Sequence, residues 1–233
     1  QAVNYAAFGA FIAAGQTCVC ASRHIVHRSI YDAFVEGLAR KARSIRVGDP
    51  AQPETQMGPV ISGKQQARVL DFVRIGQEEG ARLVAGGKVP ERLQGSGYFV
   101  EPTVFADVNA DMRIAREEVF GPFTVVIPFD TEDEAVAIAN NSPFGLAGAV
   151  RTRDIARGHR IAARLRCGIV WINDHHRLDP ASPWGGVRDS GIGHEFGVES
   201  FSDHFETKSV MVNTEARPFD WYGTTPSGQR RLN

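Results

Sequence analysis

Residues 123–172 decide the fold class and read FTVVIPFDTEDEAVAIANNSPFGLAGAVRTRDIARGHRIAARLRCGIVWI. Three short segments are rich in β-branched and aromatic residues, which predicts strands over 123–129, 146–151 and 169–172. Two longer segments between them have helical character, over 131–140 and 154–165. The first of these starts with Thr131, a good N-cap residue, followed by acidic residues. Strands that alternate with such helices are typical of an α/β fold with a mainly parallel sheet and flanking helices.

The same alternation extends toward the N-terminus. We expect helices over 29–45 and 64–79, and strands over 23–27, 82–85 and 98–105. After Asn173 the sequence is rich in Gly, Pro, His and Asp, so 174–197 is expected to be a long ordered loop. A strand is expected over 204–213 and a surface tail with docked aromatic residues over 214–233. The expected division is therefore a catalytic α/β domain over 1–203, an oligomerisation strand over 204–213 and a tail.

Composition and charge exclude several classes of protein. The 233 residues carry 26 Lys+Arg and 27 Asp+Glu, a formal net charge of −1, which speaks against a nucleic-acid-binding protein. No apolar run is long enough to suggest a membrane span. Three cysteines cannot build a disulfide framework, and an odd number favours a reducing compartment, so the cytoplasm is expected.

The chain begins in the middle of a helical sequence pattern. The chain opens at Gln1 with an apolar helical segment already in progress, without a Met or a secretory signal. We therefore expect the sequence to be a piece of a longer protein.

The first segment whose residues suit catalysis is 11–22, FIAAGQTCVCAS, where a helix meets a Gly-Gln-Thr turn and Cys18 follows. A cysteine is a nucleophile only as a thiolate, which requires exposure and nearby donors. A tight turn presents such a side chain and frees backbone N–H groups to hold an oxyanion. The alternative is that Cys18 and Cys20 are small buried core residues.

A zinc site is a second alternative for this segment. Cys18, Cys20, His24 and His27 give the spacing C-x-C-x3-H-x2-H. The first spacing is shorter than that of usual zinc sites. Residues 23–27 also predict a strand, which would point His24 and His27 to opposite faces. The sequence therefore favours no metal.

Five motifs in order resemble the NAD(P)-dependent aldehyde dehydrogenase superfamily. Residues 11–22 resemble its active-site cysteine segment, and 117–122 (EEVFGP) resemble its motif that contacts the nicotinamide ribose. Residues 140–146 (NNSPFGL), 168–173 (GIVWIN) and 182–195 (SPWGGVRDSGIGHE) resemble its later signatures. The resemblance runs over about 1–213 and covers only the C-terminal half of the family, its catalytic and oligomerisation part.

The resemblance implies roles for individual residues. Cys18 would attack the aldehyde carbon to give a thiohemiacetal, and its own N–H would donate to the oxyanion. Glu118 would accept hydrogen bonds from the nicotinamide-ribose hydroxyls of NAD or NADP, and Phe120 would pack beside the nicotinamide. Trp184 would line the substrate funnel.

Each of these residues has a plainer interpretation. Thr17 and Val19 would shape the substrate pocket or only pack. Glu118 beside Glu117 is also what a solvated surface would show, and Phe120 and Trp184 are large aromatics that often belong to a core. Phe120, Trp184 and Phe144 together suit a hydrophobic aldehyde, but they do not identify which one.

The remaining histidines and cysteines receive weaker interpretations. The resemblance puts His175 and His176 in a loop near the aldehyde entrance, where they either help select the substrate or form a plain polar loop. His194 stands where relatives usually have arginine, and an imidazole cannot form the same bidentate ion pair. Cys20 and Cys167 are expected to be packing residues.

The resemblance also defines what this sequence lacks. The family's hydrolytic glutamate, an oxyanion-hole amide and most of the dinucleotide domain would precede Gln1. We therefore expect the 233-residue chain alone to be inactive, because positioning and electrostatic stabilisation supply most catalytic power. The choice between NAD and NADP would lie in the same missing part.

Three functions remain open on the sequence. The first is oxidation of an aldehyde to a carboxylic acid, and the second transfers the acyl group to coenzyme A instead of water. The third is a non-catalytic assembly domain, since an exposed strand over 204–213 can add to another subunit's sheet edge. The resemblance implies the same strand pairing across subunits in a dimer or tetramer.

Overall fold

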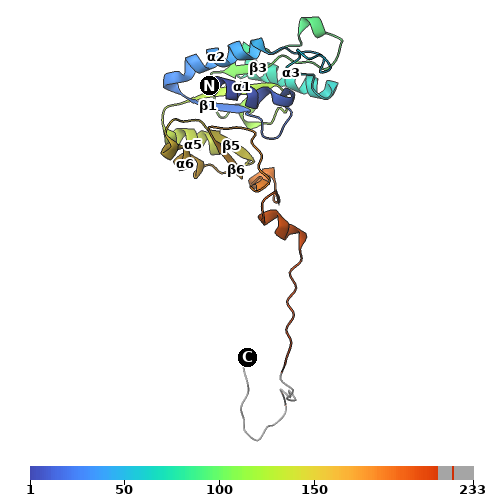
Figure 1. The fold of residues 1–233 in the computed structure, drawn as a ribbon. Coiled ribbons are helices and arrows are strands. Elements are labelled where there is room, and N and C mark those ends of the chain that lie inside the picture. The colour runs from blue at the N-terminus through green and yellow to red at the C-terminus, as the bar shows by residue number, and fades with distance from the viewer. Residues whose placement is uncertain (215–221, 223–233) are drawn as a thin grey trace.

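The computed structural model describes residues 1–214 and Tyr222. A four-stranded sheet forms the centre of the larger part, and Figure 1 shows helices packed around it. Its strand order is β1 (Arg23–His27), β4 (Phe123–Phe129), β3 (Thr103–Ala106) and β2 (Arg82–Ala85). The first three strands are parallel, and β2 runs antiparallel along the edge of β3.

The alternation of side chains along the central strands divides the core into two layers. In β4, Val126 joins one buried cluster, whereas Val125 and Ile127 join the other. This is the period of two that a strand imposes on its side chains. The helices are α1 (Ala2–Phe11) and α2 (Tyr31–Ser44) on the first face, and α3 (Gly63–Glu78) and α4 (Arg113–Arg116) on the second. Because helices cover both faces, the central strands β3 and β4 are mostly buried and largely apolar, with Thr103 and Thr124 as their buried polar residues.

A second, smaller sheet follows along the chain and lies below the first in Figure 1. It pairs β5 (Ala147–Val150) with β6 (Ile169–Ile172) in parallel, next to α5 (Glu132–Asn140) and α6 (Ile155–Ala162). The expected N-cap is present, since the Thr131 hydroxyl accepts from the Glu134 N–H at 3.2 Å. Asp154 caps α6 in the same way, at 3.1 Å from the Arg157 N–H.

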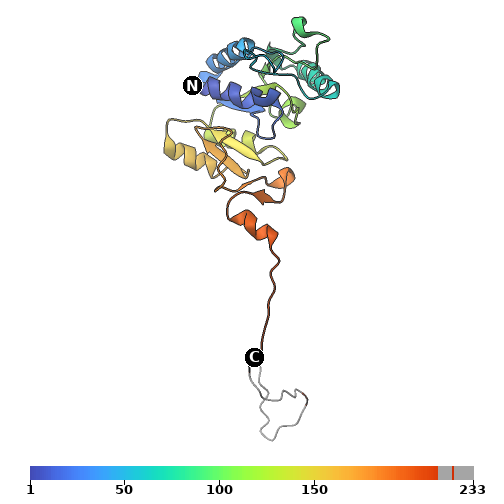
Figure 2. The ribbon, with the colours of Figure 1, turned by 45° about the vertical axis from the view of Figure 1, so that its right-hand side comes forward.

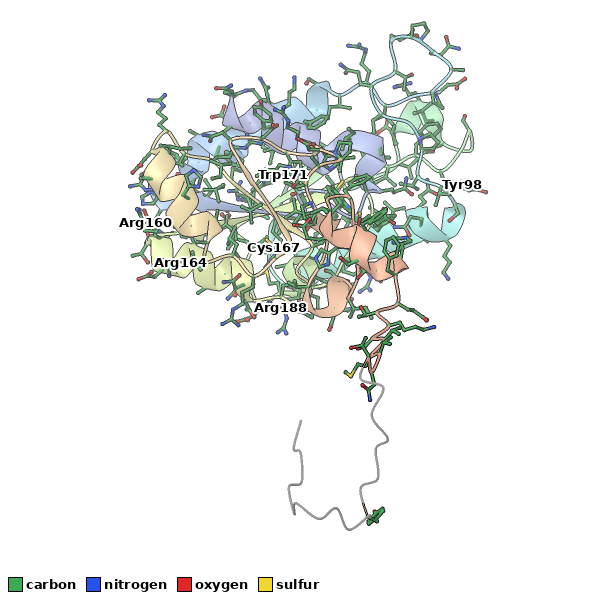
Figure 3. All side chains as sticks on the ribbon, turned by 60° about the horizontal axis from the view of Figure 1, so that its bottom comes forward. Tyr98, Arg160, Arg164, Cys167, Trp171 and Arg188 are labelled. Carbon is green, nitrogen blue, oxygen red and sulfur yellow. The ribbon has the colours of Figure 1, made fainter. Side chains whose placement is uncertain are left out.

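Several arginines connect the elements of this part. Arg23 of β1 donates to the carbonyls of Ile138 and Ala139, at the end of α5, where a cation is favoured. Figure 3 labels Arg160 on α6 and Arg164 just after that helix, and their guanidinium groups pair with Glu132 and Asp133 of α5 at 2.9 and 2.7 Å. These pairs are exposed, so they orient the two helices more than they stabilise them.

The remaining elements are short. Two short strands, β7 (Trp184–Gly185) and β8 (His194–Glu195), pair in antiparallel and form a small hairpin. The 3₁₀ turns are Ile12–Gly15, Arg28–Ile30, Glu91–Leu93, Arg188–Ser190 and Glu199–His204. The loop expected over 174–197 is thus mostly confirmed, with the hairpin as an addition. No helix among the described residues is both long and apolar enough to cross a membrane.

The α/β class is confirmed, and four strands have the predicted bounds: 23–27, 82–85, 123–129 and 169–172. Two details differ. The parallel strands belong to two sheets instead of one. The strand expected over 98–105 is confined to Thr103–Ala106, because Pro102 has no N–H to donate and Glu101 donates instead to the Lys88 carbonyl.

The strand expected over 204–213 does not form within the described chain, and its pairing with another subunit stays a prediction. His204 ends a 3₁₀ turn, and the following residues run out from the body as an extended segment without a strand partner in the described chain (Figures 1 and 2). A strand requires a partner for its backbone groups, and alternation alone does not supply one. The tail expected over 214–233 lies outside the described residues except for Thr214 and Tyr222.

Candidate active site

Cys18 lies at the tip of a tight turn between α1 and β1. The turn is closed by the Cys20 N–H, which donates to the Thr17 carbonyl at 3.0 Å. The Cys18 residue is exposed, and in the described chain its N–H has no hydrogen-bond acceptor. Both the thiol and an oxyanion donor are therefore accessible at one residue.

The neighbouring thiol has the opposite character. Burial raises the pKa of the Cys20 thiol to about 11, against a smaller lowering effect of the Thr17 backbone. A thiol with this pKa is protonated at neutral pH and a poor nucleophile. Of the two, only Cys18 combines a position at the turn with exposure, so it is the candidate nucleophile. The packing interpretation of Cys20 agrees with its partial burial.

The backbone leading into the turn is strained. Ala13, Ala14 and Gly15 have φ of +50°, +53° and +69°, three consecutive residues in the left-handed region. Such a conformation costs about 1 kcal/mol or more for each alanine, so the surrounding structure must enforce it. Strain of this kind is typical of sites that present a reactive side chain.

The contact that enforces this left-handed backbone comes from residues 117–122, which are distant in the sequence. A Cβ built on Gly15 would lie 1.9 Å from the Gly121 carbonyl oxygen. Gly121 is equally confined, because its own Cβ would lie 2.4 Å from Val69 of α3. The cysteine turn and residues 117–122 are therefore in direct backbone contact.

Side chains of α3 hold this second motif in place. The Gln65 amide donates to the carbonyls of Val119 and Phe120 at 2.8 and 2.7 Å, and Arg68 donates to the Glu118 carbonyl. Phe120 has a φ of +57° and is 40 % exposed. The Glu118 side chain is exposed, and its charge makes a small contribution to the raised pKa of the Cys20 thiol.

The expected pocket residues occupy different environments. Thr17 is half-buried in the turn itself. Val19 is only 7 % exposed, which fits the packing interpretation better than the pocket one. Trp184 is half-buried on β7, with its ring centroid 6.2 Å from that of Trp171, whose position near the middle of the molecule is labelled in Figure 3. Phe144 is exposed.

The loop after β6 packs against α1 beside the turn. The rings of His175 and His176 are stacked with centroids 4.8 Å apart, and both face the Val19 backbone. Burial, the largest cause, lowers the pKa of His175 to about 4. These imidazoles are therefore neutral at pH 7.

No group of three or more His, Cys, Asp or Glu side chains in the described chain is arranged to hold a metal ion. His24 and His27 are on the predicted strand, where His27 is exposed and the Nε2 atom of His24 is buried. The opposite directions expected for these two histidines are thus confirmed.

The buried His24 predicts a loss of stability in acid. Burial lowers the pKa of His24 to about 4, with the His175 charge as the next cause. In the unfolded chain the pKa of His24 is near 6.5, so between about pH 6.5 and 4 the unfolded chain binds a proton that the folded chain does not bind. The free energy of unfolding therefore falls as the pH drops through this range. This shift corresponds to at most about 3 kcal/mol.

The measurement is urea unfolding of the full-length protein and of its His24→Leu variant at pH 7, 5.5 and 4.5. The carboxylates titrate equally in both proteins, so their difference isolates His24. We expect the variant to lose less stability on acidification. Parallel curves for the two proteins would rule out His24 as a source of acid sensitivity.

The aldehyde dehydrogenase family model matches residues 1–210, nearly the whole described chain. This chain belongs to the aldehyde dehydrogenase family. The resemblance of the five motifs is thereby confirmed.

Individual relatives agree with this membership. Betaine aldehyde dehydrogenase of Bacillus subtilis is 44 % identical over 225 residues, which cover 96 % of this chain and 46 % of the relative. The NAD+ complex of aldehyde dehydrogenase from Bacillus cereus has a TM-score of 0.88 at 45 % identity, covering 92 % of this chain and 43 % of that one. Betaine aldehyde dehydrogenase from Staphylococcus aureus in complex with NAD+ has a TM-score of 0.92 at 40 % identity, covering 96 % and 44 %. This aldehyde dehydrogenase chain thus spans about half the length of the relatives that it matches.

Two residues of this aldehyde dehydrogenase chain had no signal in the sequence. Gln65 and Arg68 are on an ordinary amphipathic helix, and nothing in their local pattern indicates that they hold the backbone of Glu118 and Phe120. Only the packing of α3 against the second motif reveals their role. The Gly15–Gly121 contact is likewise invisible in the local sequence.

Proposed function

We propose that the full-length protein oxidises an aldehyde to a carboxylic acid, with Cys18 as the nucleophile and a nicotinamide dinucleotide as the oxidant. The observation that carries the proposal is the backbone contact between Gly15 and Gly121, which joins an exposed thiol to an exposed carboxylate motif. Membership in the aldehyde dehydrogenase family supports the same chemistry.

Cys18 performs the covalent step. Its thiolate sulfur forms a bond to the aldehyde carbon, and the π electrons of the carbonyl move to the oxygen. The unpartnered Cys18 N–H lies at the same residue and can donate to that oxyanion. Loss of hydride from the carbon re-forms the carbonyl and leaves a thioester on Cys18. Water then attacks the thioester, which releases the acid and restores the thiol.

Glu118 and Phe120 are the residues of this chain that would hold the cofactor. An exposed carboxylate accepts from two neighbouring hydroxyls, which suits the nicotinamide ribose of NAD+ or NADP+. The backbone of the motif is fixed by Gln65, so Glu118 needs little reorganisation on binding. When bound, the cofactor supplies the hydride acceptor. Two solved relatives hold NAD+, which supports NAD over NADP.

The aldehyde would be bound by Thr17 and by aromatic side chains. Trp184 presents a half-buried indole to the apolar or cationic body of a substrate, and Phe144 offers a further exposed ring. Relatives named betaine aldehyde dehydrogenase make betaine aldehyde the first compound to test.

We further propose that the 233-residue chain alone is inactive and that the full-length protein is an oligomer. The chain spans 44–46 % of its curated relatives, so much of a complete site would come from the rest of the protein. Exposed Phe205, Val210 and Val212 on the segment 204–213 suit pairing with another subunit in a dimer or tetramer. Light scattering of the protein with and without that segment tests the pairing, and an unchanged mass would refute it. Three free thiols fit a cytoplasmic enzyme.

The test of function follows the near-ultraviolet absorbance of reduced cofactor. The full-length protein is given NAD+ or NADP+ with betaine aldehyde and a panel of aliphatic, aromatic and amino aldehydes. We expect reduction of NAD+ with at least one aldehyde and none with the 233-residue chain alone. Aldehyde oxidation by the 233-residue chain alone would refute its proposed inactivity.

A parallel series with coenzyme A separates the alternatives. If reduction of the cofactor requires coenzyme A and yields an acyl-coenzyme A, then acyl transfer to coenzyme A, and not hydrolysis, is the final step. No reduction with any aldehyde, with or without coenzyme A, would refute the dehydrogenase and favour the assembly domain.

A further inference from the structure

One face of α1 is in contact with the loop that follows β6. Tyr5, Phe8 and Gly9 have the i, i+3, i+4 spacing that places side chains on one side of a helix. The Phe8 ring meets the His176 ring of this loop edge to face at 5.6 Å, and the guanidinium of Arg151, which directly follows β5, lies 3.9 Å from the centroid of the Tyr5 ring. At the third position, Gly9, the loop lies against the helix backbone.

His175 occupies the space that a side chain at Gly9 would take. A Cβ built on Gly9 would lie 2.7 Å from His175 Cδ2 and 2.8 Å from Nε2. Carbon atoms in contact normally remain at about 3.5–4.0 Å, so the imidazole edge rests directly on the helix backbone. The Nε2 atom is buried and has no hydrogen-bond partner in the described chain, so this contact is one of shape.

Gly9 also holds the chain segment that follows the nucleophile. Its carbonyl accepts from the Ala21 N–H at 2.9 Å, three residues after Cys18. The same His175 faces the Val19 backbone, and its ring centroid lies 5.1 Å from that of Trp171. His175 therefore contacts the helix before the turn and the turn itself, while the Trp171 ring supports it from β6.

We propose that His175 is a positioning residue of the nucleophile: its ring is a wedge between Gly9 and Val19 that sets the position of the Cys18 turn. The turn follows the strained backbone of Ala13 and Ala14, and a left-handed stretch persists only where neighbours hold the surrounding chain. The Gly121 contact holds Gly15, and the His175 ring holds the helix before it at Gly9. The proposal rests on Cys18 being the nucleophile of the proposed function. His175 touches no reacting atom and acts through the turn.

The test is a double-mutant cycle in the full-length protein. Gly9→Ala pushes a methyl group into the imidazole, and His175→Ala removes the imidazole. The measured quantity is the rate constant for alkylation of Cys18 by iodoacetamide, followed by peptide mass spectrometry. We expect each single variant to lower it about tenfold, and the double variant to be no slower than His175→Ala alone. Independent effects that multiply in the double variant would overturn the proposal.

Two controls separate positioning from general loosening. Gly37→Ala is another helix substitution, whose new Cβ has the Val3 side chain as its nearest neighbour, at 3.0 Å, and it should leave the Cys18 rate within about twofold. Cys20 and Cys167 are partly buried thiols in the same sample, and unfolding would increase their alkylation. A parallel rise of both in the His175 variants would overturn the proposal.

The conservative variant tests the role of shape. His175→Phe keeps a flat ring and removes both nitrogens, so it should restore the Cys18 rate to within about threefold of the parent. A phenylalanine variant as slow as His175→Ala would overturn the wedge. Alkylation needs neither aldehyde nor cofactor. A protein whose Cys18 rate depends on His175 but which reduces no cofactor would therefore retain this proposal and lose the proposed function.

Discussion

Cys18→Ala in the full-length protein should abolish aldehyde oxidation, with kcat/KM falling by about a thousandfold or more. The alanine methyl group cannot form the carbon–sulfur bond, so neither thiohemiacetal nor thioester can arise. The exposed turn and the contact between Gly15 and Gly121 do not involve the sulfur, so the variant should fold and still bind cofactor. Reduced-cofactor absorbance measures the first expectation, and the fluorescence of bound cofactor measures the second.

Cys167→Ala is the matched control for this variant. Cys167 is partly buried, burial raises the pKa of its thiol, and its S–H donates to the Ile169 carbonyl at 3.3 Å. It should therefore behave as a packing residue, with activity within about threefold of the parent. Substantial aldehyde oxidation by Cys18→Ala, or its loss in Cys167→Ala, would show that the wrong thiol has been chosen.

Gly15→Ala should be the most destabilising single substitution among those considered. The new methyl group would lie 1.9 Å from the Gly121 carbonyl oxygen, and the φ of +69° disfavours any side chain. Backbone atoms on both sides cannot move without displacing the cysteine turn or residues 117–122. We expect a loss of about 3–5 kcal/mol in the free energy of unfolding, measured by urea denaturation of the full-length protein.

Gly80→Ala separates backbone strain from the collision. Gly80 has a φ of +83°, and nothing lies within 4 Å of a Cβ built there. The substitution there should cost only the left-handed penalty, about 1 kcal/mol. Equal losses for the two variants would mean that the Gly15–Gly121 contact does not hold the two motifs together.

The strands were predictable where a run of β-branched and aromatic residues ends at turn residues. Residues 123–129 and 169–172 are such runs, and the structure has strands with those bounds. The prediction failed where a backbone donor was missing, since Pro102 interrupts the strand expected from residue 98. The segment 204–213 alternates like a strand but forms none within the described chain, so its pairing with another subunit stays a prediction.

The candidate site was predictable in its residue types but not in its supports. Cys18 and Glu118 belong to motifs that can be read along the chain, and the family match agrees with those motifs. The burial of Val19 could not be inferred, because it depends on how the elements around the turn pack. The same is true of Gln65, which reaches the second motif only through the packing of α3.

The sequence by itself determined the fold class, most of the secondary structure and the presence of a cysteine turn, because these depend on local periodicity and turn chemistry. Only the tertiary structure decided that Gly15 touches Gly121 and that His175 rests on Gly9. Both contacts join segments that are distant in the sequence. They arise from the close packing of whole helices and strands, and no local pattern records which backbones will meet when those elements pack.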